Sequence, residues 1–414
     1  MNPNAKNGES RPFANVEQLL HDYSSGYSLD QRFYKDQEVF DAEIQAIWLQ
    51  KWLFAGLACE IKELGAWFKV DIGSASAIVI RSMDGQVRGF HNTCRHRGSR
   101  ICVAEKGRSR NLTCPYHQWT YDSEGTLLFA REMSEGFDKS LHGLKPLHVE
   151  DVGGYLFVSF ADEPEPFEDF KAVTMPYLLP HSLSEAKVAF ESTIIEKANW
   201  KLVVENNREC YHCRVGHPEL LRTIAEVEDT SDSKCDPAFV VKSRQDEQRW
   251  QEQSLPFKLS NTTPGWQIVR VPMSNGLSFT MDGQPASSRL MGELPDFDVG
   301  SVRLLHFPNT WNHALGDHAI AFRVTPIDAQ ATAVTTKWLV HADAVEGVDY
   351  DLANLTKVWL ATNDQDRTLA ENNQLGINSP AYQPGPFSQQ NEYGVMAFID
   401  WYKHSMFEGL AKIR

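Results

Sequence analysis

The 414-residue sequence lacks long apolar runs, an excess of positive charge and internal repeats. No stretch approaches the roughly 20 apolar residues of a membrane-spanning helix, and the polar N-terminus has no apolar core of a secretion signal. Its 40 Lys and Arg are outnumbered by 55 Asp and Glu, a formal net charge of −15, which disfavours nucleic acid and anionic membranes as partners. We therefore expect a globular, cytoplasmic protein that binds neither nucleic acid nor membrane.

Cysteine is scarce and odd in number, which argues against a disulfide framework. Several of the cysteines cluster with histidines, so we test them first as metal ligands. The seven are Cys59, Cys94, Cys102, Cys114, Cys210, Cys213 and Cys235.

Hydrophobic patterning predicts an α+β chain in three parts. Residues 1–45 are a polar arm leading into an amphipathic helix expected at 36–51. Residues 46–165 alternate in short runs between Gly and Asp-Gly turns, as in a small antiparallel β domain. Residues 166–414 are expected to form a second domain with an antiparallel sheet and helices.

From residue 161 onward, three further elements are expected. The Asp-, Glu- and Pro-rich stretch 161–190 is typical of a linker. A helix is predicted at 199–216, and a longer one at 350–376 is predicted to lie over the sheet.

Two short motifs in the β domain combine Cys with His. Cys94 and His96 form a C-x-H pair, and Cys114 and His117 form a C-x2-H pair further along the chain. Structural zinc sites usually pair Cys with Cys and His with His, whereas each pair here mixes thiolate and imidazole. This suits a [2Fe–2S] cluster with two Cys on one iron and two His on the other, and predicts a one-electron relay. Cys102, between the pairs, is expected in the core.

A second set of candidate ligands lies in segment 200–218. On a helix, Glu205, Glu209 and His212 would share one face, because offsets of four and seven residues return to nearly the same direction. His217 could bind the same metal as His212 only if the helix ended between them, and the Gly and Pro that flank His217 supply such an ending. Read alone, the two His could equally occupy a solvated helix end.

Two imidazoles and one carboxylate form the facial triad of non-heme Fe(II) oxygenases, which leaves the opposite positions open. The carboxylate must come from elsewhere in the chain. The helix expected at 350–376 offers Asp364, Asp366 and Glu371, and the residue pattern alone does not choose among them.

In this order and spacing, the two Cys–His pairs, Glu-x2-His-x4-His and Asp-x4-Glu resemble the α subunits of Rieske non-heme iron oxygenases, in the ring-hydroxylating superfamily. The resemblance covers nearly the whole chain. It implies a Rieske domain followed by a helix-grip catalytic domain. It also implies two ligand sets: Cys94, His96, Cys114 and His117 for the cluster, and His212, His217 and Asp366 for a mononuclear Fe(II).

The resemblance further implies how electrons arrive. NAD(P)H would be oxidised by a separate flavin and iron–sulfur reductase. In a homotrimer, the cluster of one subunit would reduce the iron of its neighbour through an acidic residue. Glu209 matches that bridging position, Glu205 is the reserve candidate, and Asn206 completes the catalytic candidates. The bridging residue is more often Asp, so Glu here implies a longer bridge.

Within the family, segment 199–221 looks like the branch that removes N-methyl groups from betaines such as glycine betaine or proline betaine, with release of formaldehyde. Aromatic faces would hold the quaternary ammonium, since it cannot donate hydrogen bonds. His306 or an Arg would bind the carboxylate. The alternatives are hydroxylation of an aromatic or other aliphatic substrate, and electron transfer alone. The candidate aromatic residues are Tyr211, Phe257, Trp266 and Phe307.

Overall fold

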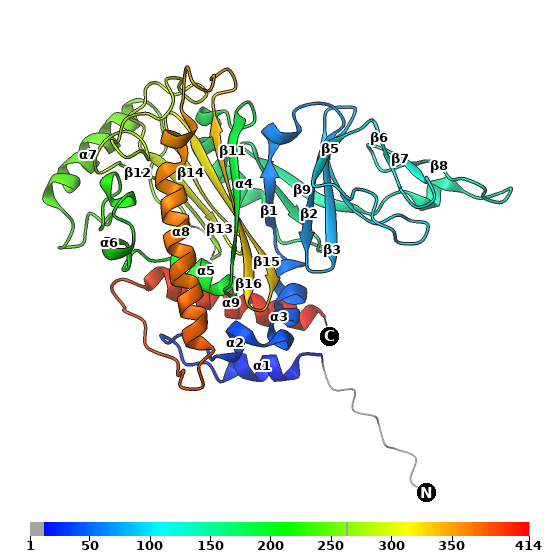
Figure 1. Ribbon diagram of the computed structural model, residues 1–414, viewed down its shortest axis with the longest axis horizontal. Coiled ribbons are helices and arrows are strands. Elements are labelled where there is room, and N and C mark those ends of the chain that lie inside the picture. Colours follow the sequence, from blue (N-terminus) through cyan, green and yellow to red (C-terminus); the bar gives the residue numbers. More distant parts are fainter. Residues whose placement is uncertain (1–11, 262–263, 414) are drawn as a thin grey trace, which may run out of the picture.

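The computed structural model describes residues 12–261 and 264–413, and it is built around two large antiparallel sheets (Figure 1). The predicted α+β class is confirmed. Most of the predicted N-terminal arm, residues 1–11, lies outside the described residues. None of the described helices is long and apolar enough to cross a membrane.

The first large sheet has seven strands and lies within residues 46–165. A smaller three-stranded sheet projects beyond it (Figure 1). In spatial order the large sheet contains β1 (Leu53–Leu57), β10 (Tyr155–Ser159), β9 (Pro146–Val152), β4 (Val87–His91), β3 (Ala75–Arg81), β2 (Ala66–Ile72) and β5 (Lys106–Arg108). The small sheet contains β6 (Asn111–Thr113), β7 (Thr120–Asp122) and β8 (Leu127–Phe129).

The second large sheet has six strands and lies within residues 166–414. Helix α8 (Leu352–Ile377), predicted at 350–376, runs along this sheet and contacts β11 (Figure 1). In spatial order the strands are β11 (Lys187–Glu196), β16 (Ala331–Val340), β15 (Ala319–Asp328), β14 (Thr310–Ala314), β13 (Ser301–His306) and β12 (Trp266–Val271).

The remaining helices pack around these sheets. They are α1 (Ala14–His21), α2 (Arg32–Lys35), α3 (Gln37–Glu43), α4 (Glu168–Leu178), α5 (Trp200–Asn207), α6 (Cys213–Gly216), α7 (Pro237–Glu252) and α9 (Tyr393–Lys412). Short 3₁₀ turns span Ala58–Ile61, Lys139–His142, Leu179–His181 and Leu220–Arg222. The stretch predicted as a linker therefore contains α4, whose Phe170 packs against Trp266 in a hydrophobic cluster.

The amphipathic helix predicted at 36–51 forms, but it changes type midway. It begins as α3 and continues as a π-helical turn over Ile44–Trp48, which contacts α9. Glu43, fully buried, accepts hydrogen bonds from Lys201 Nζ at 2.6 Å and Trp200 Nε1 at 2.7 Å. This buried ion pair fixes the start of α5 against the N-terminal helices, because an unpaired charge there would be costly.

The helix predicted at 199–216 is interrupted, which corrects the expectation for the candidate ligand segment. Helix α5 starts where the Asn199 side chain accepts a hydrogen bond from Lys201 N, and it ends at Asn207. A loop follows, in which the Glu209 carboxylate accepts hydrogen bonds from the backbone N–H of Tyr211 and His212. A side chain that bonds the backbone in this way competes with helical hydrogen bonding.

Candidate metal centres

The first predicted centre lies on two turns of the first domain. Cys94 and His96 follow β4, and Cys114 and His117 connect β6 to β7. The imidazole rings of His96 and His117 lie 4.6 Å apart, centroid to centroid, so the fold brings the two pairs together. Tyr121 places its hydroxyl 3.3 Å from Cys94 Sγ.

The thiols of this centre are buried, whereas its imidazoles reach the surface. Cys94 and Cys114 are 3% and 1% exposed, while His96 is exposed and stacks on Trp119 at 4.9 Å. Burial raises the pKa of the Cys94 thiol, and the neighbouring Cys114 adds to the rise. A cation bound between the thiols would offset the cost of ionising them in a buried site. The imidazoles, which reach the surface, offer electrons a path out of the domain. Cys102 is buried in the adjoining core, as predicted.

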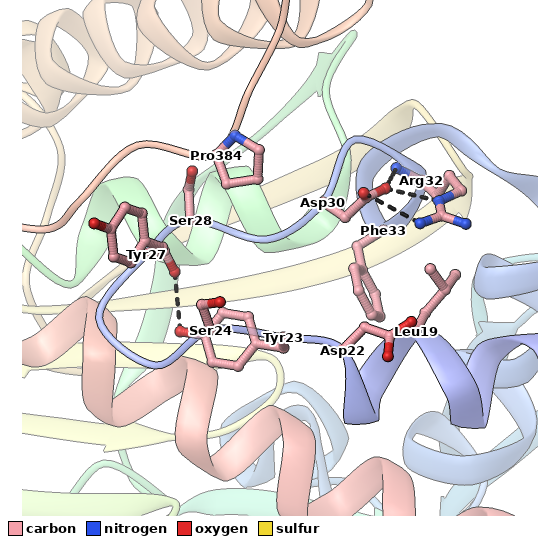
Figure 2. A pocket seen from close by; sticks show the side chains of 10 residues that line it. All are labelled: Leu19, Asp22, Tyr23, Ser24, Tyr27, Ser28, Asp30, Arg32, Phe33 and Pro384. Atoms are coloured by element: carbon pink, nitrogen blue, oxygen red, sulfur yellow. Dashed lines mark hydrogen bonds and ion pairs between the residues drawn. The ribbon is translucent and has the colours of Figure 1, made fainter.

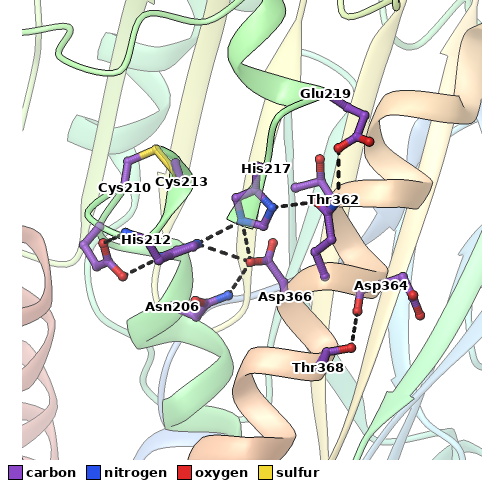
Figure 3. A network of polar contacts seen from close by, with 12 residues as sticks. Asn206, Cys210, His212, Cys213, His217, Glu219, Thr362, Asp364, Asp366 and Thr368 are labelled. Atoms are coloured by element: carbon purple, nitrogen blue, oxygen red, sulfur yellow. Dashed lines mark hydrogen bonds and ion pairs between the residues drawn. A yellow bond between two sulfur atoms is a disulfide. The ribbon is translucent and has the colours of Figure 1, made fainter. Parts of the chain in front are cut away.

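The second centre joins one short helix to a long one. His212 precedes α6 and His217 follows it, so the short helix sets the spacing of the two imidazoles. Asp366 projects from α8 toward both rings (Figure 3). His217 Nε2 lies 2.9 Å from His212 Nε2 and 2.9 Å from Asp366 Oδ1. His212 Nε2 lies 3.4 Å from the same carboxylate oxygen.

These three atoms have the mutual spacing of neighbouring ligands on one face of a metal ion. Adjacent ligand atoms of an octahedral ion with bonds of about 2.1 Å lie about 3.0 Å apart. Asp366, rather than Asp364 or Glu371, therefore completes the predicted set. Asp364 instead pairs with Arg367, which also contacts Glu371.

Each candidate ligand is held by a further polar side chain. Glu209 Oε1 lies 2.5 Å from His212 Nδ1, and Gln365 Oε1 lies 2.8 Å from His217 Nδ1. Asn206, on α5, donates a hydrogen bond from Nδ2 to Asp366 Oδ1 at 2.6 Å (Figure 3). Such partners fix the ring tautomer and leave both Nε2 atoms facing the metal position.

The electrostatics of the second centre favour a cation. Burial alone would lower the pKa of His212, but hydrogen bonds to Asp366 and Glu209 raise it to about 9. Burial likewise opposes protonation of His217, yet Asp366 raises its pKa. A site that attracts a proton to these imidazoles would also attract a divalent metal ion, which replaces the proton.

Glu205, the reserve bridging candidate, does not reach this centre. It is hydrogen-bonded to the Tyr34 hydroxyl at 3.0 Å, and burial raises its pKa to about 8. The predicted shared face of Glu205, Glu209 and His212 is wrong, because α5 ends before Glu209. Glu209 is thus the carboxylate that contacts a candidate iron ligand.

Two cysteines beside His212 are bonded to each other. Cys210 and Cys213 form a disulfide (Figure 3), which was not predicted from the sequence; it is one short bridge and not a disulfide framework. Cys59, Cys94, Cys102, Cys114 and Cys235 are free.

The predicted substrate-binding aromatic residues are not gathered at the second centre. Phe257, Trp266 and Phe307 belong to the hydrophobic core, and Tyr211 is 66% exposed. His306, the predicted carboxylate donor, is buried, and burial lowers its pKa to about 3, so its ring is neutral at neutral pH. The positions of these residues in the sequence do not show which face of each strand points toward the second centre.

A small cavity beside Asp366 contains different aromatic residues. Trp311 from β14 and Trp359 from α8 line it, and Phe322 packs against both rings, at 5.4 and 5.0 Å. Glu196, at the end of β11, also lines it. The sequence marks Glu196 only as an acidic residue that ends an alternating strand, which does not predict a place in this cavity. The full lining is Glu196, Val203, Asn206, Asn207, Trp311, Val334, Trp359, Asn363 and Asp366.

Glu196 is unusual among the lining residues of this cavity. It is 4% exposed, and within the described residues its Oε2 atom has no hydrogen-bond partner. Burial, together with the negative charges of Asp366 and Glu371, raises its pKa to about 8. In the empty cavity this carboxyl group keeps its proton at neutral pH, and an organic cation bound beside it and the two indole rings would favour its ionised form.

A larger cavity, of about 400 Å³, lies near the N-terminal helices (Figure 2). None of its lining residues is a predicted ligand or catalytic residue. Asp30, at its edge, is already paired with Arg32 at 2.8 Å. The lining is Leu19, Asp22, Tyr23, Ser24, Tyr27, Ser28, Asp30, Arg32, Phe33 and Pro384.

Two family models match the chain. Residues 51–142 match the Rieske [2Fe-2S] domain, and residues 182–408 match the ring hydroxylating alpha subunit, catalytic domain. The matched segments contain both predicted ligand sets.

Curated relatives match over most of the chain. The glycine betaine monooxygenase oxygenase subunit of Chromohalobacter salexigens is 52% identical over 394 residues, which cover 95% of this chain and 88% of that protein. The protein of the same name from Pseudomonas aeruginosa strain UCBPP-PA14 is 50% identical, covering 95% and 92%. A carnitine monooxygenase oxygenase subunit from Acinetobacter baumannii is 31% identical over 49% of this chain and 57% of its own length.

Solved structures share the fold at low sequence identity. The quaternary ammonium Rieske monooxygenase CntA, in complex with an inhibitor, has a TM-score of 0.71 at 21% identity, covering 94% of this chain and 98% of that one. Naphthalene 1,2-dioxygenase from a Rhodococcus species has a TM-score of 0.67 at 20% identity, covering 94% and 97%.

Proposed function

The chain belongs to the Rieske-type ring-hydroxylating oxygenases, and we propose that it hydroxylates an N-methyl group of a quaternary ammonium betaine. The Rieske domain carries a [2Fe–2S] cluster, and the catalytic domain carries a mononuclear iron. We assign the cluster to Cys94, His96, Cys114 and His117, and the mononuclear iron to His212, His217 and Asp366.

The mononuclear iron, when bound, supplies O₂ activation at its open positions. The chain's residues determine which bond is presented there. Asn206 holds the Asp366 carboxylate, and Glu209 and Gln365 hold the imidazoles, so the three ligand atoms keep one face of the metal. The cavity that adjoins Asp366 would place the substrate on the opposite side.

The environment of Glu196 carries the substrate assignment. A quaternary ammonium is bulky, apolar on its surface and positively charged, so it is recognised by aromatic faces and a nearby anion rather than by hydrogen-bond acceptors. The indole rings of Trp311 and Trp359, together with the Glu196 carboxylate, offer these contacts in one cavity. The names of the curated relatives point the same way.

The proposed reaction needs no acid–base pair from the protein. Once a methyl carbon bears a hydroxyl group, the resulting hemiaminal breaks its C–N bond and releases formaldehyde and the demethylated amine. Glycine betaine and proline betaine both carry such a methyl group. The remaining requirement is a cavity that directs one methyl toward the metal and excludes bulk water.

Electron supply completes the proposal. A separate reductase would take electrons from NAD(P)H and deliver them to the cluster near the exposed His96. We propose a homotrimer in which Glu209 connects His212 to a cluster His of the neighbouring subunit. The exposed imidazole of His96 in the first domain and the contact between Glu209 and His212 support this route. We place the protein in the cytoplasm.

The products formed from a panel of substrates test the proposal. The enzyme is supplied with a reductase, NADH and O₂, together with glycine betaine, proline betaine, carnitine or naphthalene. We expect formaldehyde and an equal amount of demethylated amine from one betaine. Formation of a diol from naphthalene, with no formaldehyde from any quaternary ammonium, would show that the substrate class is wrong.

A further inference from the structure

The disulfide between Cys210 and Cys213 encloses the candidate iron ligand His212. Cys210 is exposed at the end of the loop that follows α5, whereas Cys213 is 4% exposed at the start of α6. A bridge across so short a segment removes little conformational entropy from the unfolded chain. Its position beside the metal centre therefore needs a reason other than global stability.

Cys213 lies close to the two imidazoles of the second centre. One ligand atom from each of His212, Cys213 and His217 falls within 4.8 Å of the others. The disulfide bond decides what this sulfur can do, because a thiolate binds metals strongly and a disulfide sulfur does not. In the bonded state the iron is left with two imidazoles and a carboxylate.

We propose that Cys210 and Cys213 form a reversible thiol–disulfide pair that selects the metal in the catalytic site. With the disulfide closed, His212, His217 and Asp366 present a facial triad with open positions, which suits Fe(II). With the disulfide reduced, the Cys213 thiolate joins them as a fourth ligand. Four protein ligands that include a thiolate are typical of a closed zinc site, which has no position for O₂.

The switching step balances with a small dithiol as the reductant. One thiolate of the dithiol attacks the sulfur of Cys210, the exposed residue of the pair, and breaks the bond to Cys213, which leaves as a thiolate. The second thiolate of the dithiol then displaces Cys210, so the dithiol becomes a cyclic disulfide. Two electrons have passed to the protein, and a metal ion takes the place of the proton on Cys213.

The proposal concerns the metal centre and holds for any substrate. It accounts for the placement of the two cysteines. The buried Cys213 lies beside the imidazoles, and the exposed Cys210 can be attacked by a dithiol. Among the free cysteines, Cys235 is buried near Val227 and is distant in sequence from both ligand sets, so it serves as a control.

Metal competition on the full-length protein tests the switch. Protein with its cluster intact and its mononuclear metal removed by a chelator is dialysed against equal Fe(II) and Zn(II) without oxygen, with or without dithiothreitol. Bound zinc per subunit is measured by mass spectrometry, and alkylation of denatured protein reports the state of Cys210 and Cys213. We expect dithiothreitol to raise the zinc-to-iron ratio about tenfold, at the lower end of changes made by altered metal surroundings.

Three variants separate the switch from nonspecific effects. Cys210→Ser leaves Cys213 as a free thiol, so the zinc-to-iron ratio of this variant should be high without dithiothreitol. Cys213→Ser should give a low ratio in both conditions, and Cys235→Ser should behave like the natural protein. The proposal is overturned if dithiothreitol opens the disulfide of the natural protein without changing the ratio. It is also overturned if Cys210 and Cys213 are both alkylated without any reductant.

Discussion

The Nδ1 atom of His212 donates a hydrogen bond to Glu209 Oε1 across 2.5 Å, and we propose that an electron from a neighbouring subunit passes through this pair. The opposite nitrogen of the ring, Nε2, faces His217 and Asp366. One imidazole thus connects the partly buried Glu209 carboxylate to the metal position.

Glu209→Gln tests this connection. The amide oxygen can still accept the His212 hydrogen bond, so both metal centres should stay occupied. The negative charge is lost, and we expect cluster reoxidation by the catalytic site to slow by about 10- to 100-fold, as for other residues that orient a metal ligand. Stopped-flow absorbance of the reduced cluster after mixing with O₂ and substrate measures the rate.

Glu205→Gln is the matched control, because Glu205 is bonded to Tyr34 and not to His212. Its rate should stay near that of the natural protein. Equal rates of cluster reoxidation in Glu209→Gln and Glu205→Gln would show that electrons do not pass through Glu209.

Asp366→Asn tests the carboxylate ligand. An amide binds Fe(II) less strongly than a carboxylate, and it also disturbs the hydrogen bond from Asn206. We expect loss of the mononuclear iron with retention of the cluster spectrum. Metal analysis beside acid-labile sulfide separates the two iron pools. Asp364→Asn, on the same helix but paired with Arg367, should keep all its iron; iron loss there instead would reassign the ligand.

Trp311→Leu tests the substrate cavity. A desolvated cation–π contact contributes about 1 to 2 kcal/mol, so its loss should raise the KM for the betaine about tenfold. Phe307→Leu is the control, since Phe307 packs against Phe398 and Trp401 in the core. That variant should lower the Tm and leave KM unchanged. A raised KM for Phe307→Leu alone would restore the original aromatic candidates.

The raised pKa of Glu196 predicts a pH-dependent stability in the metal-free protein. Its folded pKa is about 8 against an ordinary value of 4.5, so the folded state binds a proton that the unfolded state has lost between these values. The contribution of this proton binding to the free energy of unfolding is fully present below 4.5, the pKa of Glu196 in the unfolded state, and is lost as the pH rises through about 8. Glu196→Gln cannot ionise and should escape this loss.

Thermal unfolding at pH 5 and pH 9 measures the effect. We expect the Tm of Glu196→Gln, relative to the natural protein, to rise between the two pH values. A difference that does not change with pH would mean that Glu196 is already ionised in the folded state at pH 5.

The features that could be predicted from the sequence are those encoded in short segments. The spacing within Cys94–His96 and Cys114–His117 specifies a cluster, because each pair sits on one turn. Helix α8 could be predicted from its periodicity. Asp366 could be chosen from the residues only through the family resemblance, since its role depends on contact with a segment far away in the chain.

The errors arose where side chains compete with the backbone or where distant elements meet. Helix α5 stops at Asn207 because the loop after it is held by Glu209, an interaction that helical periodicity does not reveal. The cavity combines Glu196 from β11, Trp311 from β14 and Trp359 from α8. No sequence pattern links these three residues, so their proximity becomes visible only in the folded chain.

Formaldehyde release in a single turnover tests the proposed N-demethylation without any partner protein. Protein with both centres loaded is reduced chemically, freed of reductant and mixed with O₂ and each betaine in turn, so that no reductase is needed. We predict about one formaldehyde per mononuclear iron with one betaine, and none with Asp366→Asn. A fully loaded, reduced protein that oxidises its cluster but releases no formaldehyde with any betaine would contradict the account.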